Sequence, residues 1–214
     1  MNRNEPQSQD GPSSLAQEAI RRSLSRRQDA AENDVRRMIE VGRNLLSSGR
    51  NPRVADIVEA AGLSNDAFYR YFRSKEDFVA AVVEDGGNRL VAYMERKMAD
   101  HDSADAKIIA ALEAIMSQAG DPGVASATRN ILANSTGHHQ RESGARTRLE
   151  LSMMKLLSGP LAQLKSADPE RDGRAVAALI MGVMENFLWS ETPPSKKDLS
   201  HLSGFIRNAI TATT

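Results

Sequence analysis

The sequence predicts an all-α protein with a small N-terminal head and a larger C-terminal helical body. Apolar residues recur at the three- and four-residue spacing of helices over most of the chain, and no segment shows the alternation or β-branched richness of strands. Breaks rich in Gly, Pro and Ser separate these helical stretches.

Basic residues are concentrated near the N-terminus: residues 21–75 hold 12 Arg and Lys against 7 Asp and Glu, although the whole chain has no net charge. A basic segment on a neutral chain is typical of a DNA-binding module attached to another domain, and a solvated basic face without a partner is the alternative.

Residues 1–27 are expected to form a flexible tail. They are rich in Ser, Gln, Asn and Arg and contain two prolines, so they bury too little apolar surface to offset the entropy of ordering. They contain no apolar stretch of the kind that signal peptides have. Two basic pairs, Arg21-Arg22 and Arg26-Arg27, end the tail. They predict an arm that contacts DNA, and a tail of no consequence is the alternative.

Residues 28–80 are predicted to fold as the head. Its first helix has one apolar stripe, which begins at Val35 and ends at Leu46 with the period of a helix. The breakers at residues 47–49, followed by Pro52, end this helix.

Two short helices follow, over residues 54–61 and 65–72. Gly62 separates them, and Ser64 stands where its hydroxyl can cap the second one. The next start signal, at residues 74–77, has the form of a capping box because an acid stands at the third helical position. Two short helices joined by a three-residue turn that contains a glycine are what a helix-turn-helix requires. The head is therefore predicted to bind DNA.

The second short helix presents polar side chains on the face opposite its apolar anchors. Such side chains hydrogen-bond to phosphates and base edges, and a cation at the start of the next helix adds a phosphate contact. The predicted DNA-contacting residues are Arg53, Ser64, Asn65, Asp66, Tyr69, Arg70, Tyr71 and Lys75. Asp66 repels phosphates, so it acts either as a partner of the helix dipole or as an acceptor for cytosine N4.

The stretch VADIVEAAGLSNDAFYRYFRSKEDFVAAVV resembles the DNA-binding head of the tetracycline-repressor (TetR) family. Members have a pattern close to DIA-x-x-AG-[VL]-S-x-x-x-[FL]-Y-x-[YH]-F-x-[SN]-K-x-x-L. The matching positions are Asp56, Ile57, Ala61, Gly62, Leu63, Ser64, Phe68, Tyr69, Tyr71, Phe72, Ser74, Lys75 and Phe78. The resemblance covers roughly residues 33–80. It implies a homodimer on a roughly palindromic operator, acting as a repressor that is released when a small molecule enters the body.

Three positions depart from the pattern. Val58 stands where the family usually has Ala at the helix crossing, and Arg53 replaces the usual Thr or Ser before the second helix. Asp66 places an acid on the predicted reading helix. We expect these departures to change details of the DNA contact and to leave the fold of the head intact.

Residues 81–214 are predicted to form a helical body for ligand binding and dimerisation. Helices are expected over 75–100, 104–119, 122–135, 146–166, 170–191 and 196–211. A polar loop is expected from Thr136 to Gly144, and His138, His139 and Glu142 within it are interpreted as solvated residues rather than metal ligands. The chain has no cysteine, which excludes disulfides and thiolate metal sites.

The last two helices predict a dimer interface. Residues 175–189 are apolar nearly all round, and the final helix has a second apolar stripe, so a monomer can hardly bury both. The TetR resemblance implies the same interface. Its predicted residues are Val176, Ile180, Phe187, Leu202, Phe205, Ile206 and Ala209.

Methionines in the body predict a pocket for a small apolar or amphipathic effector, because thioethers adapt to ligands of varied shape. Ordinary core packing is the alternative. The candidate ligand-binding residues are Met94, Met98, Met116, Met154 and Met184. Gly86-Gly87 interrupts the helix that joins head to body and predicts a hinge, with close packing of a neighbouring helix as the alternative.

These observations together predict a cytoplasmic transcriptional regulator without cofactor or metal. Its expected partners are double-stranded operator DNA, a second copy of the chain and a small effector, and not a membrane. An activator or a ligand-independent regulator remains an alternative. An enzyme with an accessory DNA-binding head would need catalytic residues in 80–214, and no such spacing occurs there. A nucleoid protein would need a strongly basic chain.

Overall fold

The computed structural model describes residues 14–135 and 139–212, and every regular element within them is an α-helix. The all-α prediction is therefore confirmed. The helices are α1 (Ser14–Ser47), α2 (Val54–Ala61), α3 (Asn65–Tyr71), α4 (Lys75–Ala99), α5 (Ala104–Gly120), α6 (Pro122–Ala133), α7 (His139–Gln163), α8 (Pro169–Trp189) and α9 (Lys196–Ala212). Within the described ranges, no helix is both long and apolar enough to cross a membrane.

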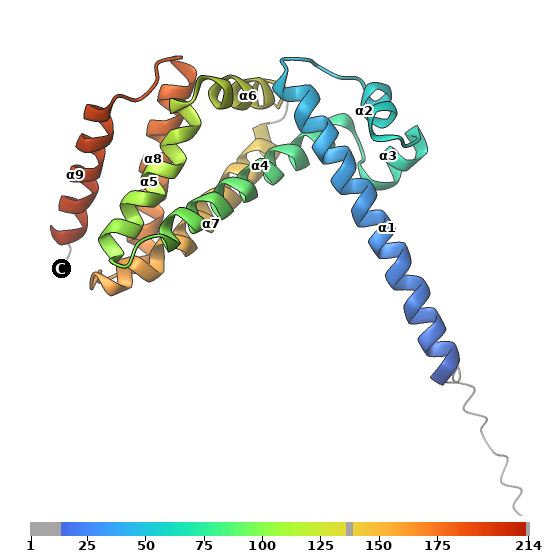
Figure 1. The fold of residues 1–214 in the computed structure, drawn as a ribbon, viewed down its shortest axis with the longest axis horizontal. Coiled ribbons are helices and arrows are strands. Elements are labelled where there is room, and N and C mark those ends of the chain that lie inside the picture. The colour runs from blue at the N-terminus through green and yellow to red at the C-terminus, as the bar shows by residue number, and fades with distance from the viewer. Residues whose placement is uncertain (1–13, 136–138, 213–214) are drawn as a thin grey trace, which may run out of the picture.

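Buried side chains form two separate clusters. One is built on α1, α2, α3 and the start of α4, and we call it the head core. The other is built on the rest of α4 and on α5 to α9, and we call it the body core. Figure 1 shows α2 and α3 at one end of the molecule and α5, α8 and α9 at the other, with α4 running between them. A change in the body can therefore reach the head along a continuous helix.

The helix α1 starts earlier than the sequence led us to expect. Residues 14–27, expected in a flexible tail, are helical, so that expectation was wrong for them; residues 1–13 lie outside the described part of the chain. The extension is almost wholly exposed, as Leu15 at 73% and Leu24 at 59% illustrate, and it projects beyond the head (Figure 1). Its Leu, Ala, Gln, Glu and Arg residues favour helix without burial, and Glu18 and Arg22 form an i,i+4 ion pair at 3.6 Å.

The helix α7 also starts early, at His139, inside the polar stretch expected to be a loop. Polarity does not prevent a helix there, since Gln, Arg and Glu are good helix formers. His138 and the side chains of His139 and Glu142 lie outside the described residues. In the part of the chain that the structure describes, no group of three or more His, Asp or Glu side chains is placed to hold a metal.

An aromatic cluster fixes α3 and α4 in the head core. The Phe68 and Phe78 rings lie 5.5 Å apart between centroids, and Phe72 meets Phe78 edge-on at 5.1 Å. Helix α1 also packs on Phe78 at Gly42, where an added Cβ would lie 2.3 Å from Phe78 Cζ. Only a glycine lets α1 approach α4 so closely at this point.

Candidate nucleic-acid interface and effector cavity

The turn between α2 and α3 is set by Gly62. Its φ of +65° lies in the left-handed region, where a side chain would strain the backbone. The N–H of Gly62 donates to Glu59 O at 3.1 Å, and the N–H of Leu63 donates to Val58 O at 2.8 Å. These bonds end α2 and turn the chain into α3.

Ser64 caps α3 as predicted, because its Oγ accepts from the N–H of Ala67 at 3.2 Å. The exposed arc of α3 then consists of Asn65, Asp66, Tyr69 and Arg70, whereas the opposite arc packs into the head core. Tyr69 is 60% exposed and stacks edge-on against the buried Phe68, 5.3 Å between centroids. The helix α3 therefore exposes a polar face to solvent, while its apolar face is buried in the head core.

Arg53 stands at the N-cap of α2 and forms an ion pair with Asp56. Its N–H donates to Asp56 Oδ2 at 2.7 Å, and its Nη2 lies 3.2 Å from Asp56 Oδ1. The hydrogen bond from the Arg53 side chain, followed by the one from its backbone, lowers the pKa of Asp56 below its usual value, and Arg50 adds a smaller attraction. Arg50 and Arg53 are both exposed and lie close to one acid, so this corner of the head keeps an excess of positive charge.

Lys75 begins α4, behind the N-cap Ser74, whose Oγ accepts from the N–H of Asp77 at 3.2 Å. The Lys75 ammonium bonds to Asn51 Oδ1 and is thereby held against the loop that precedes α2. Asn51 and Arg73 are exposed polar neighbours of this site. The sequence reasoning did not select Arg50, Asn51 or Arg73, although each flanks a predicted contact residue.

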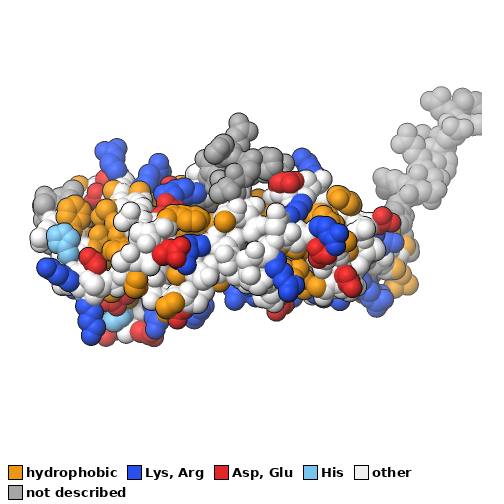
Figure 2. Space-filling view, turned by 90° about the horizontal axis from the view of Figure 1, so that it is seen from above, with side chains coloured by type: hydrophobic (Ala, Val, Ile, Leu, Met, Phe, Trp, Pro, Cys, Tyr) orange, Lys and Arg blue, Asp and Glu red, His pale blue; other side chains and the backbone are white. Residues whose placement is uncertain are grey.

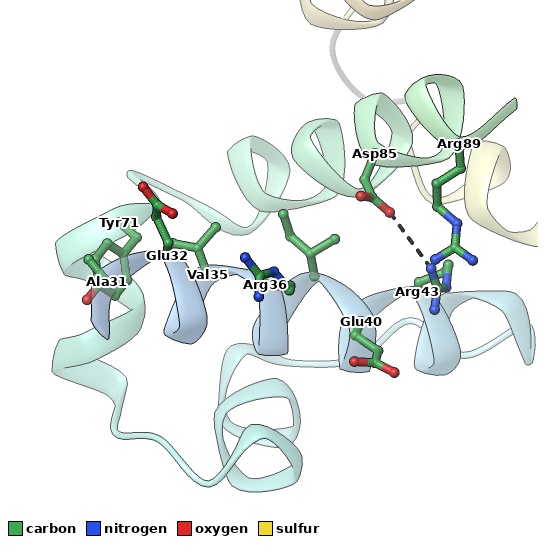
Figure 3. Close-up of a pocket in the computed structure, with 10 residues that line it drawn as sticks. Ala31, Glu32, Val35, Arg36, Glu40, Arg43, Tyr71, Asp85 and Arg89 are labelled. Carbon is green, nitrogen blue, oxygen red and sulfur yellow. Dashed lines mark ion pairs between the residues drawn. The ribbon is translucent and has the colours of Figure 1, made fainter. Parts of the chain in front are cut away.

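Tyr71 is the one predicted DNA-contact residue that points elsewhere. Its side chain is half-buried, and its hydroxyl donates to Asp34 Oδ2 on α1 at 3.4 Å. It lines a groove of about 810 Å³ between α1, α3 and α4 (Figure 3). Its position lies one residue past the exposed arc, so the helical turn carries it away from Tyr69 and Arg70 and toward α1.

A second cavity, of about 520 Å³, lies where head and body meet, and we call it the effector cavity. Residues of α1 and of α4 to α8 line it: Arg43, Val82, Val83, Gly86, Gly87, Leu90, Gln118, Thr128, Ile131, Leu132, Ser135, Ala145, Arg146, Leu149, Met181, Met184, Glu185 and Trp189. Its size and mostly apolar wall with a few polar groups are typical of small-molecule sites. Arg146 bonds to Glu150 at 3.1 Å and to Glu185, and the bond to Glu185 raises the pKa of Arg146.

The helix α6 joins this cavity to the end of α1. Asn130 Nδ2 donates to Ser47 O at 2.9 Å, and Asn134 Nδ2 donates to Arg50 O at 3.3 Å. Both bonds satisfy carbonyl groups in and just after the last turn of α1, which have no partner within that helix. Because Thr128 and Leu132 on α6 line the cavity, a shift of α6 would reach the segment that precedes α2.

Residues 51–82 match the family model described as bacterial regulatory proteins, tetR family. Solved structures share the fold over most of the chain. A putative TetR-family transcriptional regulator from Rhodococcus sp. is 20% identical, covers 84% of this chain and 99% of its own, and has a TM-score of 0.64. E. coli NemR in its reduced form is 18% identical, with coverages of 85% and 99% and a TM-score of 0.62. No curated protein sequence matches the chain.

Residues 51–82 therefore have the DNA-binding segment of tetR-family regulators, and the chain shares its fold with solved structures of that family. Regulators of this family are transcription factors and not enzymes. A third structure of the same fold is FadR from Bacillus subtilis in complex with stearoyl-CoA, which is 18% identical, with coverages of 83% and 98% and a TM-score of 0.57.

Of the five methionines predicted to bind ligand, Met184 alone lines the effector cavity. The other four are buried in cores or between helices, at 0% exposure for Met94, 5% for Met98, 1% for Met116 and 7% for Met154. Their packing fits the alternative of ordinary core residues. Gly86 and Gly87 do line the cavity, and α4 continues as one helix through both of them.

Four of the seven predicted dimer residues face the interior of their own chain. Val176, Ile180, Leu202 and Ile206 are at most 8% exposed, so we correct their assignment to a surface. Contrary to our expectation, one chain buries the inner part of both stripes, because α5 and α7 cover the inner face of α8, and α5 covers that of α9. Phe205, at 56%, remains exposed with Ala209, and Phe187 is half-buried.

Proposed function

We propose that the chain is a dimeric repressor that binds a roughly palindromic operator and leaves it when a small molecule occupies the effector cavity. The observation that supports the DNA contact is the exposed arc of α3, where Asn65, Asp66, Tyr69 and Arg70 stand on a buried aromatic anchor. Asn and Arg are the residues that pair best with adenine and guanine edges in a major groove. Arg53 and Lys75 would contact the flanking phosphates, which position the helix without reading sequence. The protein would act in the cytoplasm, where bacterial DNA lies.

A dimer would require a palindromic operator, because the two heads of one twofold assembly engage two half-sites about one helical turn apart. The surface that we assign to the dimer is the outer face of α8 and α9, with Phe205 and Ala209 exposed and Phe187 partly covered. An exposed phenylalanine beside partly covered apolar residues is a feature of interaction sites.

The effector cavity supports release by a small molecule. It lies between the body core and the end of α1, and α4 and α6, which both pack on α1, line it. FadR from Bacillus subtilis holds stearoyl-CoA on the same fold, so this architecture accommodates a ligand with a long apolar part. A ligand releases DNA only if it binds one head arrangement better than the other.

Two arms of one experiment test this function. Fragments of genomic DNA that bind the purified protein are selected, and small molecules are then screened for release of the protein from those fragments. Selected fragments that share an inverted repeat, and release by at least one compound, are the expected result. Binding without any shared sequence would contradict the reading role of α3. Tight operator binding that no compound reverses would favour a ligand-independent regulator, and a rise in transcription on binding would favour an activator.

A further inference from the structure

Two arginines reach the effector cavity, Arg43 from α1 and Arg146 from α7. The guanidinium group stays charged at all working pH values and donates in a fork that matches carboxylates and phosphates. An arginine on the wall of an apolar cavity is therefore the natural partner of an anionic group on a ligand. The arginine that binds the ligand's anionic group should be the one whose ion pairs with carboxylates of the chain are weaker.

Arg146 is already engaged by two acids. It bonds to Glu150 at 3.1 Å and to Glu185, and Glu185 itself lines the cavity. A ligand anion at Arg146 would have to displace one of these carboxylates and would then lie beside it. The repulsion between the two anions works against binding there.

Arg43 is held much more loosely. Among the residues that the structure describes, its one ion pair is with Asp85, and the Nη1–Oδ2 distance is 3.8 Å. A charge-assisted hydrogen bond is about 2.7–2.9 Å long, so the Arg43–Asp85 contact is an ion pair without a hydrogen bond. Its side chain is 25% exposed, and it lines both the effector cavity and the groove of Figure 3.

Arg89 adds a second cation near Arg43. It stands one helical turn after Asp85 on α4, on the side of that helix that faces α1 (Figure 3). The groove as a whole balances three arginines against three acids, so the preference for an anion comes from its Arg43 end, where two arginines meet one acid. There an incoming anion would gain hydrogen bonds that Asp85 does not supply.

We propose that the effector is an apolar molecule with one anionic group, and that Arg43 holds that group. The proposal rests on the proposed function, since it assigns the chemistry of the ligand that the effector cavity accepts. The apolar part lies against Leu132, Leu149 and Met184, which line the same cavity. Arg43 follows Gly42, the residue at which α1 packs on Phe78. The anion therefore contacts a helix of the head directly, without an intermediate residue of the body.

Binding can be followed without DNA, because Trp189 lines the cavity and is the single tryptophan of the sequence. The probes are decanoate, decanol and decyltrimethylammonium, which share a chain and differ in charge, each titrated against Trp189 emission. We expect decanoate to bind at least about tenfold more tightly than decanol, the difference that one hydrogen bond to a charged group makes. The cation is expected to bind most weakly. Arg43→Gln should lower the affinity for decanoate to that for decanol, and Arg43→Lys should retain most of the preference.

The matched control is Arg146→Gln/Glu185→Gln, which removes the other cavity arginine together with the acid that lines the cavity beside it, and so leaves the net charge unchanged. This variant is expected to keep the preference for decanoate. The proposal is overturned if the preference survives Arg43→Gln, if the control loses it, if decyltrimethylammonium binds most tightly, or if no probe changes Trp189 emission. A compound of another class that still releases the operator would leave the proposed function standing while this ligand chemistry fails.

Discussion

Replacing both glycines of α4 by alanine tests whether Gly86-Gly87 is a hinge. A Cβ on Gly86 would meet nothing within 4 Å, and a Cβ on Gly87 would meet Leu149 at 3.7 Å, an ordinary contact. Neither glycine is therefore needed for close packing. Each alanine favours a helix interior by about 1 kcal/mol, so Gly86→Ala/Gly87→Ala should raise the free energy of unfolding by about 2 kcal/mol. For a chain of this size that corresponds to an increase in Tm of about 4–8 °C.

Gly42→Ala is the matched control, since it makes the same change in another helix. The new methyl group would lie 2.3 Å from Phe78 Cζ in the head core, and overpacking of this kind costs about 1–3 kcal/mol. We expect this variant to melt below the wild type, although alanine is the better helix former. A Tm that rises equally in both variants would refute the packing argument.

The functional result separates a hinge from a rigid helix. If bending at Gly86-Gly87 changes the spacing of the two heads, the double variant should keep its operator affinity but resist release by effector. Both glycines line the cavity, so release must be compared at equal occupancy, measured by Trp189 emission. Release at the same occupancy as the wild type would contradict the hinge.

Three further predictions concern the surfaces that meet DNA and the second chain. Lys75→Ala should weaken binding to all DNA sequences and reduce the salt slope by about one unit, and Tyr69→Phe should lower operator affinity without unfolding; unchanged DNA titrations of both variants would disprove the assigned face. Deleting residues 1–27 should lower operator affinity at fixed salt because it removes five arginines, four of them in the two basic pairs, and equal affinity would exclude the arm. Phe205→Glu should give monomers that lose operator binding, and a dimer in sedimentation would reject that interface.

Local signals explain why the head could be predicted from the sequence. Gly62 allows one backbone conformation that few other residues adopt, and Ser64 and Ser74 cap the helices that follow them. These effects act within three or four residues, so the spacing of the motif reveals them. The exposed start of α1 could not be predicted from burial, because the helix there is favoured by the propensity of residues that bury almost nothing.

The cavity and the dimer surface depend on long-range contacts, which local patterns do not reveal. The residue Met94 follows the same helical pattern as any other apolar residue, and it is buried because several helices of the body core pack together around it. Residues 175–189 of α8 are apolar nearly all round, so the sequence does not distinguish the buried Ile180 from the half-buried Phe187. Arg43 was not selected because it reaches the cavity through the close approach of Gly42 to Phe78, which joins residues far apart in the sequence.

The most direct test of a sequence-reading α3 is the ratio of two dissociation constants. The full chain is titrated, at one salt concentration, with a fragment selected from genomic DNA and with the same fragment after its shared sequence has been scrambled. A specific regulator binds its site at least about 10³-fold more tightly than other DNA, and we expect a ratio of that order. Equal affinities for the two fragments would contradict the account, because phosphate contacts alone would then explain all of the binding.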